Sequence, residues 1–383
     1  MRDSRHRSEV VDTITEDVQD DQLKAKPSFE EDYTVGEELG SGGYGIVYAG
    51  LRIRDDKRVA IKYVPKNTIK HMVELNGRCV PKEIMLMEKV RHIQGVAALV
   101  DWYEQTFCFV LIMERVEHGV DFYDFLLDCE YVSERIAKNL FQQIVTTVKE
   151  IHACGVVHRD LKSANMLINT RTLDIKIIDF GSGALLKDTP YYESQGTKRF
   201  QPPEWFMHHS YLGVPAAVWS LGIILYDMVC AGPPFKKSKY IIKASPVFPK
   251  RLKVSDEFKD LVKKCLSFSP YSRPSCDQIL QHPWMKADSG IKLSFIIPTT
   301  SVSQEDHHHT DLIDESHDAP GNDADENDAD ISPVATSSSH SFRLSAEVLR
   351  SVRHFVRPQS GKISPTLAAS LQIARKIRGR CAV

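Results

Sequence analysis

The sequence lacks the features that would mark a secreted, membrane-spanning or disulfide-stapled protein. Its eight cysteines are scattered, without a CxxC pair or a metal-ligand spacing, so we expect free thiols and no disulfide framework. No run approaches the roughly 18 apolar residues of a membrane span, and residues 1–22 contain no apolar core of a secretion signal. We therefore expect a protein of the cytoplasm or the nucleus. With a net charge of −2, a basic nucleic-acid-binding fold is not expected.

Strand patterns fill the first part of the chain and helical patterns the second. We expect strands at 33–53 around a glycine turn, at 59–64 and at 108–116, with a helix at 78–91. Ser133 begins a helix whose apolar stripe recurs every three or four residues, and Gly155 ends it. Short strands follow at 166–168 and 175–178, and helical patterns run from 216 to 284. This order predicts an α+β protein with a small β-rich lobe and a larger helical lobe.

Composition divides the chain into four parts. Residues 1–32 are polar and charged, so we predict disorder there, and residues 33–286 form the folded domain. The polar linker 287–340, also predicted to be disordered, contains the segment 305–330 with eleven acidic side chains and no Lys or Arg. The tail 341–383 carries nine Lys or Arg against a single acid. Its apolar stripes predict basic amphipathic helices for an anionic surface or a partner groove; the alternative is a disordered tail that contacts the acidic segment.

The first chemical motif is a glycine-rich run from Leu39 to Val47, Leu-Gly-Ser-Gly-Gly-Tyr-Gly-Ile-Val. Glycines without side chains let backbone N–H groups close over a polyphosphate. The same spacing occurs in dinucleotide-binding folds, where the loop opens a helix. Here strand-forming residues continue after the loop, which favours a β-hairpin over the phosphates. A plain hairpin turn is the remaining alternative.

The sequence Val-Ala-Ile-Lys, which ends at Lys62, follows at the distance expected for a phosphate-binding lysine. For a lone strand lysine, the alternative is an outward-facing charge. Lys62 needs a carboxylate to stay charged and aimed, and Glu83 and Glu88 are the two candidates on the following helix. We prefer Glu83, because it shares a helical face with Met87 on an inward-facing stripe.

The third motif, His-Arg-Asp-Leu-Lys-Ser-Ala-Asn over 158–165, is highly specific because this eight-residue stretch fits the order His-Arg-Asp-x-Lys-x-x-Asn. Asp160 would accept the proton of a substrate hydroxyl, Lys162 would neutralise the γ-phosphate, and Asn165 would hold Mg²⁺. Asp179 begins an Asp-Phe-Gly turn 19 residues after Asp160 (179 − 160). It would hold the Mg²⁺ that bridges the β- and γ-phosphate oxygens. The sequence thus predicts phosphoryl transfer from ATP.

One further charged pair is predicted to be structural. Pro-Pro-Glu, ending at Glu204, precedes the apolar helix pattern, and Arg273 stands in Ser-Arg-Pro. We expect Arg273 to pair with Glu204 and to brace the helical lobe without taking part in the chemistry.

With these motifs in order, the chain resembles the protein kinase superfamily over about two-thirds of its length, and within it the Pim serine/threonine kinases. The Pim-like stretches are DFGSGALLKDT at 179–189, PPEW at 202–205, AAVWSLG at 216–222 and LYDMVC at 225–230. Ala217 is specific, because most kinases have an Asp at that position. The resemblance implies a bilobal, monomeric enzyme that transfers the γ-phosphate of ATP, with Mg²⁺, to Ser or Thr of basic protein substrates.

The resemblance also implies the nucleotide-binding residues and an intrinsic activity. Met113 would be the gatekeeper and 114–117 the hinge, with Asp124 placed to meet the ribose or the substrate. Pim-like kinases need no activation-loop phosphorylation, and here Glu193 would supply a carboxylate for Arg159. The full predicted nucleotide-binding set is Leu39, Gly40, Ser41, Gly42, Gly43, Tyr44, Gly45, Val47, Ala60, Lys62, Glu83, Met113, Glu114, Val116, Asp121, Asp124 and Leu167.

Several positions depart from the Pim pattern. Val116 stands where the hinge has a proline, so an additional N–H donor becomes available to adenine. Ser163 and Ala164 replace acids of the catalytic loop and Gly232 replaces another, so the pocket for basic substrates is thinned. The alternative function is a pseudokinase scaffold. Pseudokinases usually lose the strand lysine or one of the two aspartates, and this chain keeps all three. Lys162 favours Ser and Thr over Tyr as the acceptor.

Overall fold

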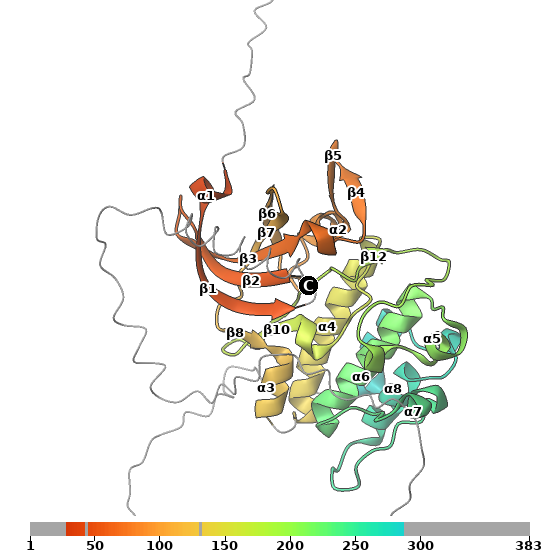
Figure 1. Ribbon diagram of the computed structural model, residues 1–383. Coiled ribbons are helices and arrows are strands. Elements are labelled where there is room, and N and C mark those ends of the chain that lie inside the picture. Colours follow the sequence, from red (N-terminus) through yellow and green to blue (C-terminus); the bar gives the residue numbers. More distant parts are fainter. Residues whose placement is uncertain (1–27, 43–44, 130–131, 287–383) are drawn as a thin grey trace, which may run out of the picture.

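The computed structural model describes residues 28–42, 45–129 and 132–286. The predictions for residues 1–27, Gly43, Tyr44, the linker 287–340 and the tail 341–383 lie outside these residues. The described chain consists of an antiparallel sheet followed by a largely helical part (Figure 1). The predicted α+β architecture with two lobes is therefore confirmed.

The sheet of the first lobe has five antiparallel strands in the order β1-β2-β3-β7-β6. They are β1 (Tyr33–Gly42), β2 (Gly45–Arg52), β3 (Lys57–Pro65), β7 (Cys108–Glu114) and β6 (Leu99–Glu104). Burial alternates along β2, so Ile46 and Tyr48 face a small aromatic core while Val47 lies on the other face. Val47 pairs with Lys62 across the strands, so both lie on the face opposite the aromatic core.

The segment predicted as one helix over 78–91 is divided. Its first four residues form β5 (Arg78–Pro81), which pairs with β4 (Met72–Leu75), and only α2 (Lys82–Val90) is helical. The turn between the strands is Asn76-Gly77, with φ of 51° and 73°. This two-residue turn matches the natural twist of strands, and it was the available signal for a hairpin. The strand predicted over 108–116 also ends early, at Glu114.

The fold begins before Tyr33, where the folded domain was predicted to start. Residues 29–32 form the short helix α1 (Phe29–Asp32), and Phe29 is 2% exposed. Its ring stacks on Tyr33, with centroids 6.0 Å apart, and meets the edge of Tyr103 at 5.7 Å. The Tyr103 hydroxyl donates to Asp32 Oδ2 at 2.5 Å. An aromatic cluster thus anchors residues 29–32, which the polar composition of 1–32 had predicted to be disordered.

The second lobe is built around two long helices, α4 (Glu134–Ala153) and α6 (Gly213–Cys230). The other helices are α3 (Phe122–Asp128), α5 (Pro203–His208), α7 (Ser238–Lys243), α8 (Asp256–Cys265), α9 (Cys276–Leu280) and α10 (Pro283–Lys286). Short strands β8 (Gly119–Asp121), β9 (Val156–Val157), β10 (Met166–Asn169), β11 (Ile175–Ile177) and β12 (Ala184–Leu185) lie towards the first lobe. The 3₁₀ turns of this lobe are η2 (Ser163–Asn165), η3 (Lys198–Phe200) and η4 (Pro270–Ser272), whereas η1 (Lys66–Thr68) follows β3 in the first lobe.

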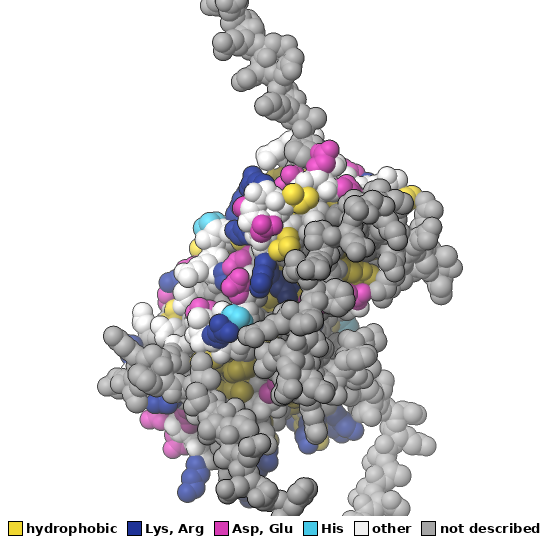
Figure 2. All heavy atoms as spheres, turned by 90° about the vertical axis from the view of Figure 1, so that its left-hand side faces the viewer, with side chains coloured by type: hydrophobic (Ala, Val, Ile, Leu, Met, Phe, Trp, Pro, Cys, Tyr) yellow, Lys and Arg dark blue, Asp and Glu magenta, His cyan; other side chains and the backbone are white. Residues whose placement is uncertain are grey.

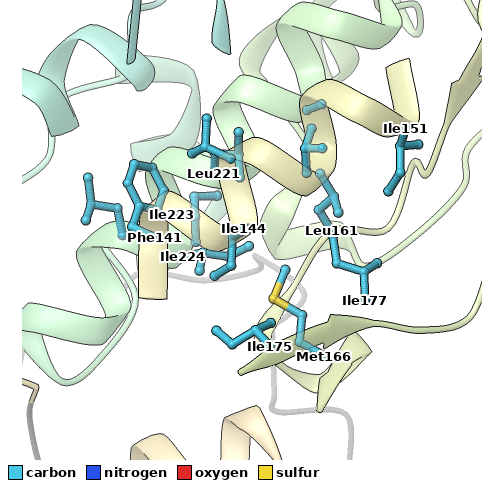
Figure 3. Packing of buried hydrophobic residues seen from close by; sticks show 14 of the residues in the cluster. Phe141, Ile144, Ile151, Leu161, Met166, Ile175, Ile177, Leu221, Ile223 and Ile224 are labelled. Carbon is cyan, nitrogen blue, oxygen red and sulfur yellow. The ribbon is translucent and has the colours of Figure 1, made fainter. Parts of the chain in front are cut away.

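The main core lies between α4, α6 and the strands that carry the catalytic loop. Figure 3 shows Ile144 of α4 near Leu221 and Ile224 of α6 on one side and near Met166 and Ile175 of the strands on the other. The predicted α4 stripe is therefore confirmed, because Leu140, Ile144, Val148 and Ile151 are buried and its first member, Ile136, is partly buried against the same core. This packing fixes the strands next to the catalytic loop.

α6 is the exception to the expectation that no segment is apolar enough to span a membrane. By length and composition alone this 18-residue helix passes that test, but 78% of it is buried inside the fold. Its apolar surface is used in contacts with α4, α8 and the catalytic-loop region. A helix that is hydrophobic on all sides is typical of the centre of a large lobe.

A buried ion pair braces α5 against the end of the lobe, as predicted. Arg273 donates to Glu204 through Nη1 at 2.8 Å and Nη2 at 2.6 Å. The Arg273 side chain is fully buried, stacks over Trp219 and also donates to the carbonyl oxygens of Ser267 and Pro215. A bidentate, fully bonded pair of this kind is costly to break, because one charge would be left buried alone.

Arg273→Ala should therefore lower the free energy of unfolding by about 3–5 kcal/mol. For a domain of this size the melting temperature should fall by roughly 6–20 °C in thermal unfolding. Arg91→Ala is the matched control, because Arg91 is exposed and its pair with the partly exposed Glu88 should add little to stability. Equal effects of the two substitutions would contradict the assignment of Arg273 as the brace.

Candidate active site

Lys62 lies at the centre of the site, between two carboxylates from distant parts of the chain. Its Nζ donates to Glu83 Oε1 at 2.6 Å and to Asp179 Oδ1 at 3.0 Å. The side chains of Lys62 and Glu83 are each 7% exposed. Glu88, the other candidate, pairs with Arg91 instead. The preference for Glu83 is confirmed, and one ammonium group joins β3, α2 and the loop after β11.

The electrostatics of this trio keep Lys62 charged. Burial alone would lower the pKa of Lys62, but Asp179 and Glu83 together raise it above its ordinary value. Burial alone would likewise raise the pKa of Asp179, but the Lys62 charge outweighs burial and the pKa is lowered. For Glu83 burial prevails over Lys62, and the pKa is raised. Asp179 is therefore the more acidic of the two carboxylates, as suits a ligand for a cation.

Two residues of the site have a left-handed backbone conformation. Arg159 has φ of 64° and Asp179 has φ of 65°, a conformation that costs a non-glycine residue about 1–3 kcal/mol. Contacts between their loops offset this cost: Arg159 Nε donates to Ser182 O at 2.7 Å, and Ile178 N donates to Asn165 O at 3.0 Å. The two loops thus hold each other in the strained form.

The Asp160 carboxylate is held by three donors. Oδ2 accepts from Lys162 Nζ at 2.9 Å and from Asn165 Nδ2 at 3.0 Å, and Oδ1 accepts from Thr197 N at 2.9 Å. Asp160 is only 6% exposed. The structure therefore brings the predicted Asp160, Lys162 and Asn165 together in one network and fixes the direction of the carboxylate.

Thr197 is a site residue that sequence reasoning missed. Besides its backbone contact with Asp160, its Oγ1 accepts from Lys162 Nζ at 2.7 Å. Gly196, with φ of 80°, permits this approach, because a Cβ there would lie 2.5 Å from Arg159 O and 3.0 Å from Asp160 Oδ1. The Gly-Thr pair shortly before Pro-Pro-Glu was the available signal, since a glycine is required where the chain passes this close to another backbone.

His158 and Phe180 support the catalytic loop from inside the fold. Phe180 is fully buried in the same core cluster as residues of α2, and its ring centroid lies 4.9 Å from that of His158. Burial lowers the pKa of His158. The neutral ring accepts from Asp160 N through Nδ1 at 3.3 Å and can donate through Nε2 to Ile178 O at 3.0 Å. His158 is therefore a positioning residue.

The predicted nucleotide-binding residues come from both lobes around Lys62. Across the strands Gly40 pairs with Val47 and Ala60 with Met113, while in the second lobe Leu167 pairs with Asp121. None of these residues is buried, so each has exposed surface that a ligand could contact. Exposed positions are Leu39, Gly40 and Ser41; partly exposed ones are Gly45, Val47, Ala60, Met113 and Leu167. Gly42 pairs with Gly45 at the end of the hairpin.

The predicted hinge uses Glu114 as a structural residue. Its Oε1 lies 2.9 Å from Lys176 Nζ, and its Oε2 accepts from Ala98 N at 3.2 Å. The carboxylate thus ties β7 to β11. Among the backbone hydrogen bonds of the described residues, none is donated by Val116 N. The Val116 N–H thus has no backbone acceptor among these bonds, and its contact with a ligand stays a prediction.

The two acids after the hinge have different settings. Asp121 Oδ1 accepts from Tyr123 N at 2.7 Å and caps α3. Burial raises the pKa of Asp121 to about 6. Asp124 lies in the first turn of α3 and is exposed. Its carboxylate is therefore the more accessible of the two, and its contact with a ribose or a substrate stays a prediction.

Arg159 pairs with Glu193, as expected from the sequence. The Arg159 side chain is 2% exposed, and its Nη1 lies 3.5 Å from Glu193 Oε2. The guanidinium also lies over the ring of Tyr191, 5.2 Å from its centroid. Lys82, the first residue of α2, has a pKa lowered by burial and then by Arg159, with Glu193 acting in the opposite direction. One carboxylate thus serves two cations where α2 meets the loop.

Comparison with known proteins agrees with this geometry. Residues 33–285 match the model of the protein kinase domain. The chain is 41% identical over 298 residues to the serine/threonine-protein kinase pim-2 of Danio rerio, covering 73% of this chain and 95% of that protein. It is 40% identical over 294 residues to the serine/threonine-protein kinase prk-2 of Caenorhabditis elegans, covering 75% and 67%. The chain therefore belongs to the protein kinase family and is a Pim-like serine/threonine protein kinase.

Proposed function

We propose that this kinase is Mg²⁺-dependent and active without phosphorylation of its own loop, and that it prefers moderately basic protein substrates. The observation that carries the proposal is the complete set of ion pairs around Lys62 next to an Asp160 held by three donors. A pseudokinase scaffold, the alternative function, would not need this arrangement. We also propose a cytoplasmic or nuclear location, supported by seven described cysteines that are all free. That the protein is a monomer stays a prediction.

The donor atoms of Asn165 and Asp179 fit a Mg²⁺ ion. Within the described residues, both hydrogen bonds of the Asn165 side chain are donated by Nδ2, which leaves its carbonyl oxygen for a cation. Lys62 and Gly181 N both bond Asp179 through Oδ1, which leaves Oδ2. Among the described residues no cluster of three or more His, Cys, Asp or Glu forms a closed metal cage. One carboxylate and one amide suit Mg²⁺, which takes its other ligands from phosphate and water. When bound, the ion would neutralise phosphate charge.

The protein side of the reaction follows from the fixed groups. Asp160 would orient the substrate hydroxyl and take its proton, because its carboxylate is rigidly aimed by Lys162, Asn165 and Thr197. Lys162 would offer positive charge to the transferred phosphoryl group, and Lys62 would hold the other phosphates. Most of the catalysis would thus come from positioning and electrostatics prepared before the substrate arrives.

The setting of Arg159 supports activity without loop phosphorylation. In a switched kinase, a phosphate orders the loop by pairing with arginine. Here Glu193 already supplies an anion to Arg159, and Arg159 bonds the carbonyl oxygens of Ser182 and Gly183. The bond is long, at 3.5 Å, and Glu193 is half-exposed, so most of the ordering comes from the buried contacts of Arg159.

Substrate preference depends on which carboxylates are accessible. Of the two catalytic-loop positions where the family has acids, Ser163 is buried and only Ala164 is partly exposed. Asp227 lines a pocket of about 150 Å³ between α3 and the end of α6, but Arg199 lies in the same pocket. Burial raises the pKa of Asp227, and Arg199 offsets this in part. An incoming arginine would meet both charges, which supports a weakened preference for basic substrates.

Asp160→Asn should lower kcat about 100- to 10,000-fold while ATP binding persists, because only the proton acceptor is lost. The measurements are steady-state phosphorylation of a peptide and direct titration of ATP. Glu88→Gln, on the outer face of α2, is the control that should leave both unchanged. Wild-type turnover by Asp160→Asn would show that Asp160 does not accept the proton.

Kinase stripped of phosphate by a phosphatase, which is then removed, should start turnover without a lag. The physical reason is that Arg159 already has its anion. The measurement is the time course of product formation over the first turnovers. A lag that disappears when Thr189, Tyr191, Tyr192 or Thr197 is substituted would show that loop phosphorylation is required.

Ala164→Glu should sharpen the preference for an arginine upstream of the phosphoacceptor by roughly ten- to a hundredfold, the range expected for one partly shielded carboxylate–Arg contact. The measurement is kcat/KM for two peptides that differ only in that arginine. Ala164→Gln, which has the same shape but no charge, is the control and should leave the ratio unchanged. An unchanged ratio in Ala164→Glu would show that this loop does not face the substrate.

A further inference from the structure

One surface of the second lobe carries charge of a single sign. Residues 228–255 contain six Lys and one Arg but no Asp or Glu. They cover the end of α6, α7 and the loop that leads to α8. All seven basic side chains, from Lys236 to Lys253, are exposed, and we call them the lysine-rich surface. By contrast, the upper part of the face in Figure 2 carries basic and acidic side chains interspersed.

Lys239 of this surface lies over the ring of its neighbour Tyr240, 5.8 Å from the ring centroid. Among the ion pairs of the described residues, none includes a member of the lysine-rich surface. The neighbouring acid Asp256, at the start of α8, pairs with Lys259. Three exposed apolar side chains lie among the lysines: Tyr240, Ile242 and Val247. Cations interspersed with exposed apolar groups fit a partner segment that is acidic and carries a few apolar residues.

The described chain ends next to this surface. Glu134 of α4 accepts from Ser255 N, at the end of the basic loop, and from Trp284 Nε1, in the last described helix, both at 2.7 Å. Aromatic contacts make the same connection: Phe248 of the basic loop packs on Phe258 at 6.0 Å, and Phe258 packs on Trp284 at 5.7 Å. The residues that follow α10 therefore start from beside the lysine-rich surface.

We propose that the lysine-rich surface binds the acidic segment 305–330 of the same chain. The segment has eleven acidic side chains and no Lys or Arg, and Leu312 and Ile313 lie among the acids. It begins 19 residues after Lys286 (305 − 286), the last described residue. A flexible linker of that length spans about 25 Å on average, and it starts from α10, which contacts α8. The sign of the charge, the apolar residues and the length of the linker all fit this contact.

The basic tail 341–383 is the rival partner for the same acids. The lysine-rich surface has the advantage of being built on a folded helix and loop, so binding to it orders only one partner. A contact between the acidic segment and the tail would have to order two segments. An attached segment also acts at a high effective concentration, which favours the contact within one chain over a contact between two copies.

Carbodiimide cross-linking of the full-length protein tests this contact, because it joins a lysine amine directly to a carboxylate that touches it. We expect links between lysines 237, 239 and 243 and the segment 305–330, mapped by mass spectrometry. The links should fall at least tenfold when salt rises from about 0.05 to 0.5 M, since exposed charges are then screened. A mixture of ¹⁵N-labelled and unlabelled protein should give links within chains of one isotope only.

Matched variants separate this contact from a general effect of charge. Lys237→Glu with Lys239→Glu and Lys243→Glu should abolish the links, and the corresponding Gln variants should weaken them without reversing charge. Arg54→Glu with Lys57→Glu and Lys89→Glu, three exposed positions on the first lobe, should keep them. Links from the acidic segment only to Lys362 or Lys376 of the tail would overturn the proposal. So would links only between isotopes, which would indicate a second copy, or no links at all.

Discussion

The position of Lys62 between Glu83 and Asp179 is the interaction on which the rest of the site depends. A buried ammonium group is stable only if its charge is fully met, and here two elements far apart in sequence must both be in place to meet it. α2 is thereby held against β3, and the Asp179 loop is held in its left-handed conformation. Phe180 can then be buried beside His158. Lys82, adjacent to Glu83, connects α2 to the Arg159–Glu193 pair, because both charges of that pair act on the pKa of Lys82.

The catalytic loop has an unusual support. Where most kinases have an Asp in the helix below, this chain has Ala217, which lines a small pocket of about 30 Å³ together with Asp160 and Thr197. Other contacts hold the loop instead. The Arg159 side chain donates to the carbonyl oxygens of Ser182 and Gly183, and the Thr197 backbone N–H donates to the Asp160 carboxylate. Because these partners belong to the segment 182–197, the geometry of Asp160 depends on that segment being ordered. Glu193, which belongs to that segment, lies with its carboxylate 3.5 Å from the Arg159 guanidinium.

The chemistry of the site could be predicted from the sequence because its residues occur in motifs with fixed spacing. Lys62 and Glu83 meet as expected, and so do Asp160, Lys162 and Asn165. Contacts outside motifs could not be predicted. Phe29 is buried because of three aromatic rings that come together only in the folded sheet, and Glu114 bonds Lys176 from a strand 62 positions later. The Asn76-Gly77 turn could be recognised from the local sequence, but the helical pattern after Pro81 led to residues 78–81 being predicted as part of the helix.

Charge is distributed unevenly around the substrate side of the second lobe. Asp121 ends β8 and caps α3, Asp124 lies in α3 and Asp227 in α6. Phe235, one residue before the lysines begin, is among the residues that line the pocket with Asp227. Exposed charges act over about 8 Å at physiological salt, so an uncovered lysine-rich surface would weaken the attraction of a basic substrate to those acids. An acidic segment bound there would cancel this field. Recognition of basic substrates would then depend on a segment outside the catalytic domain as well as on the carboxylates within it.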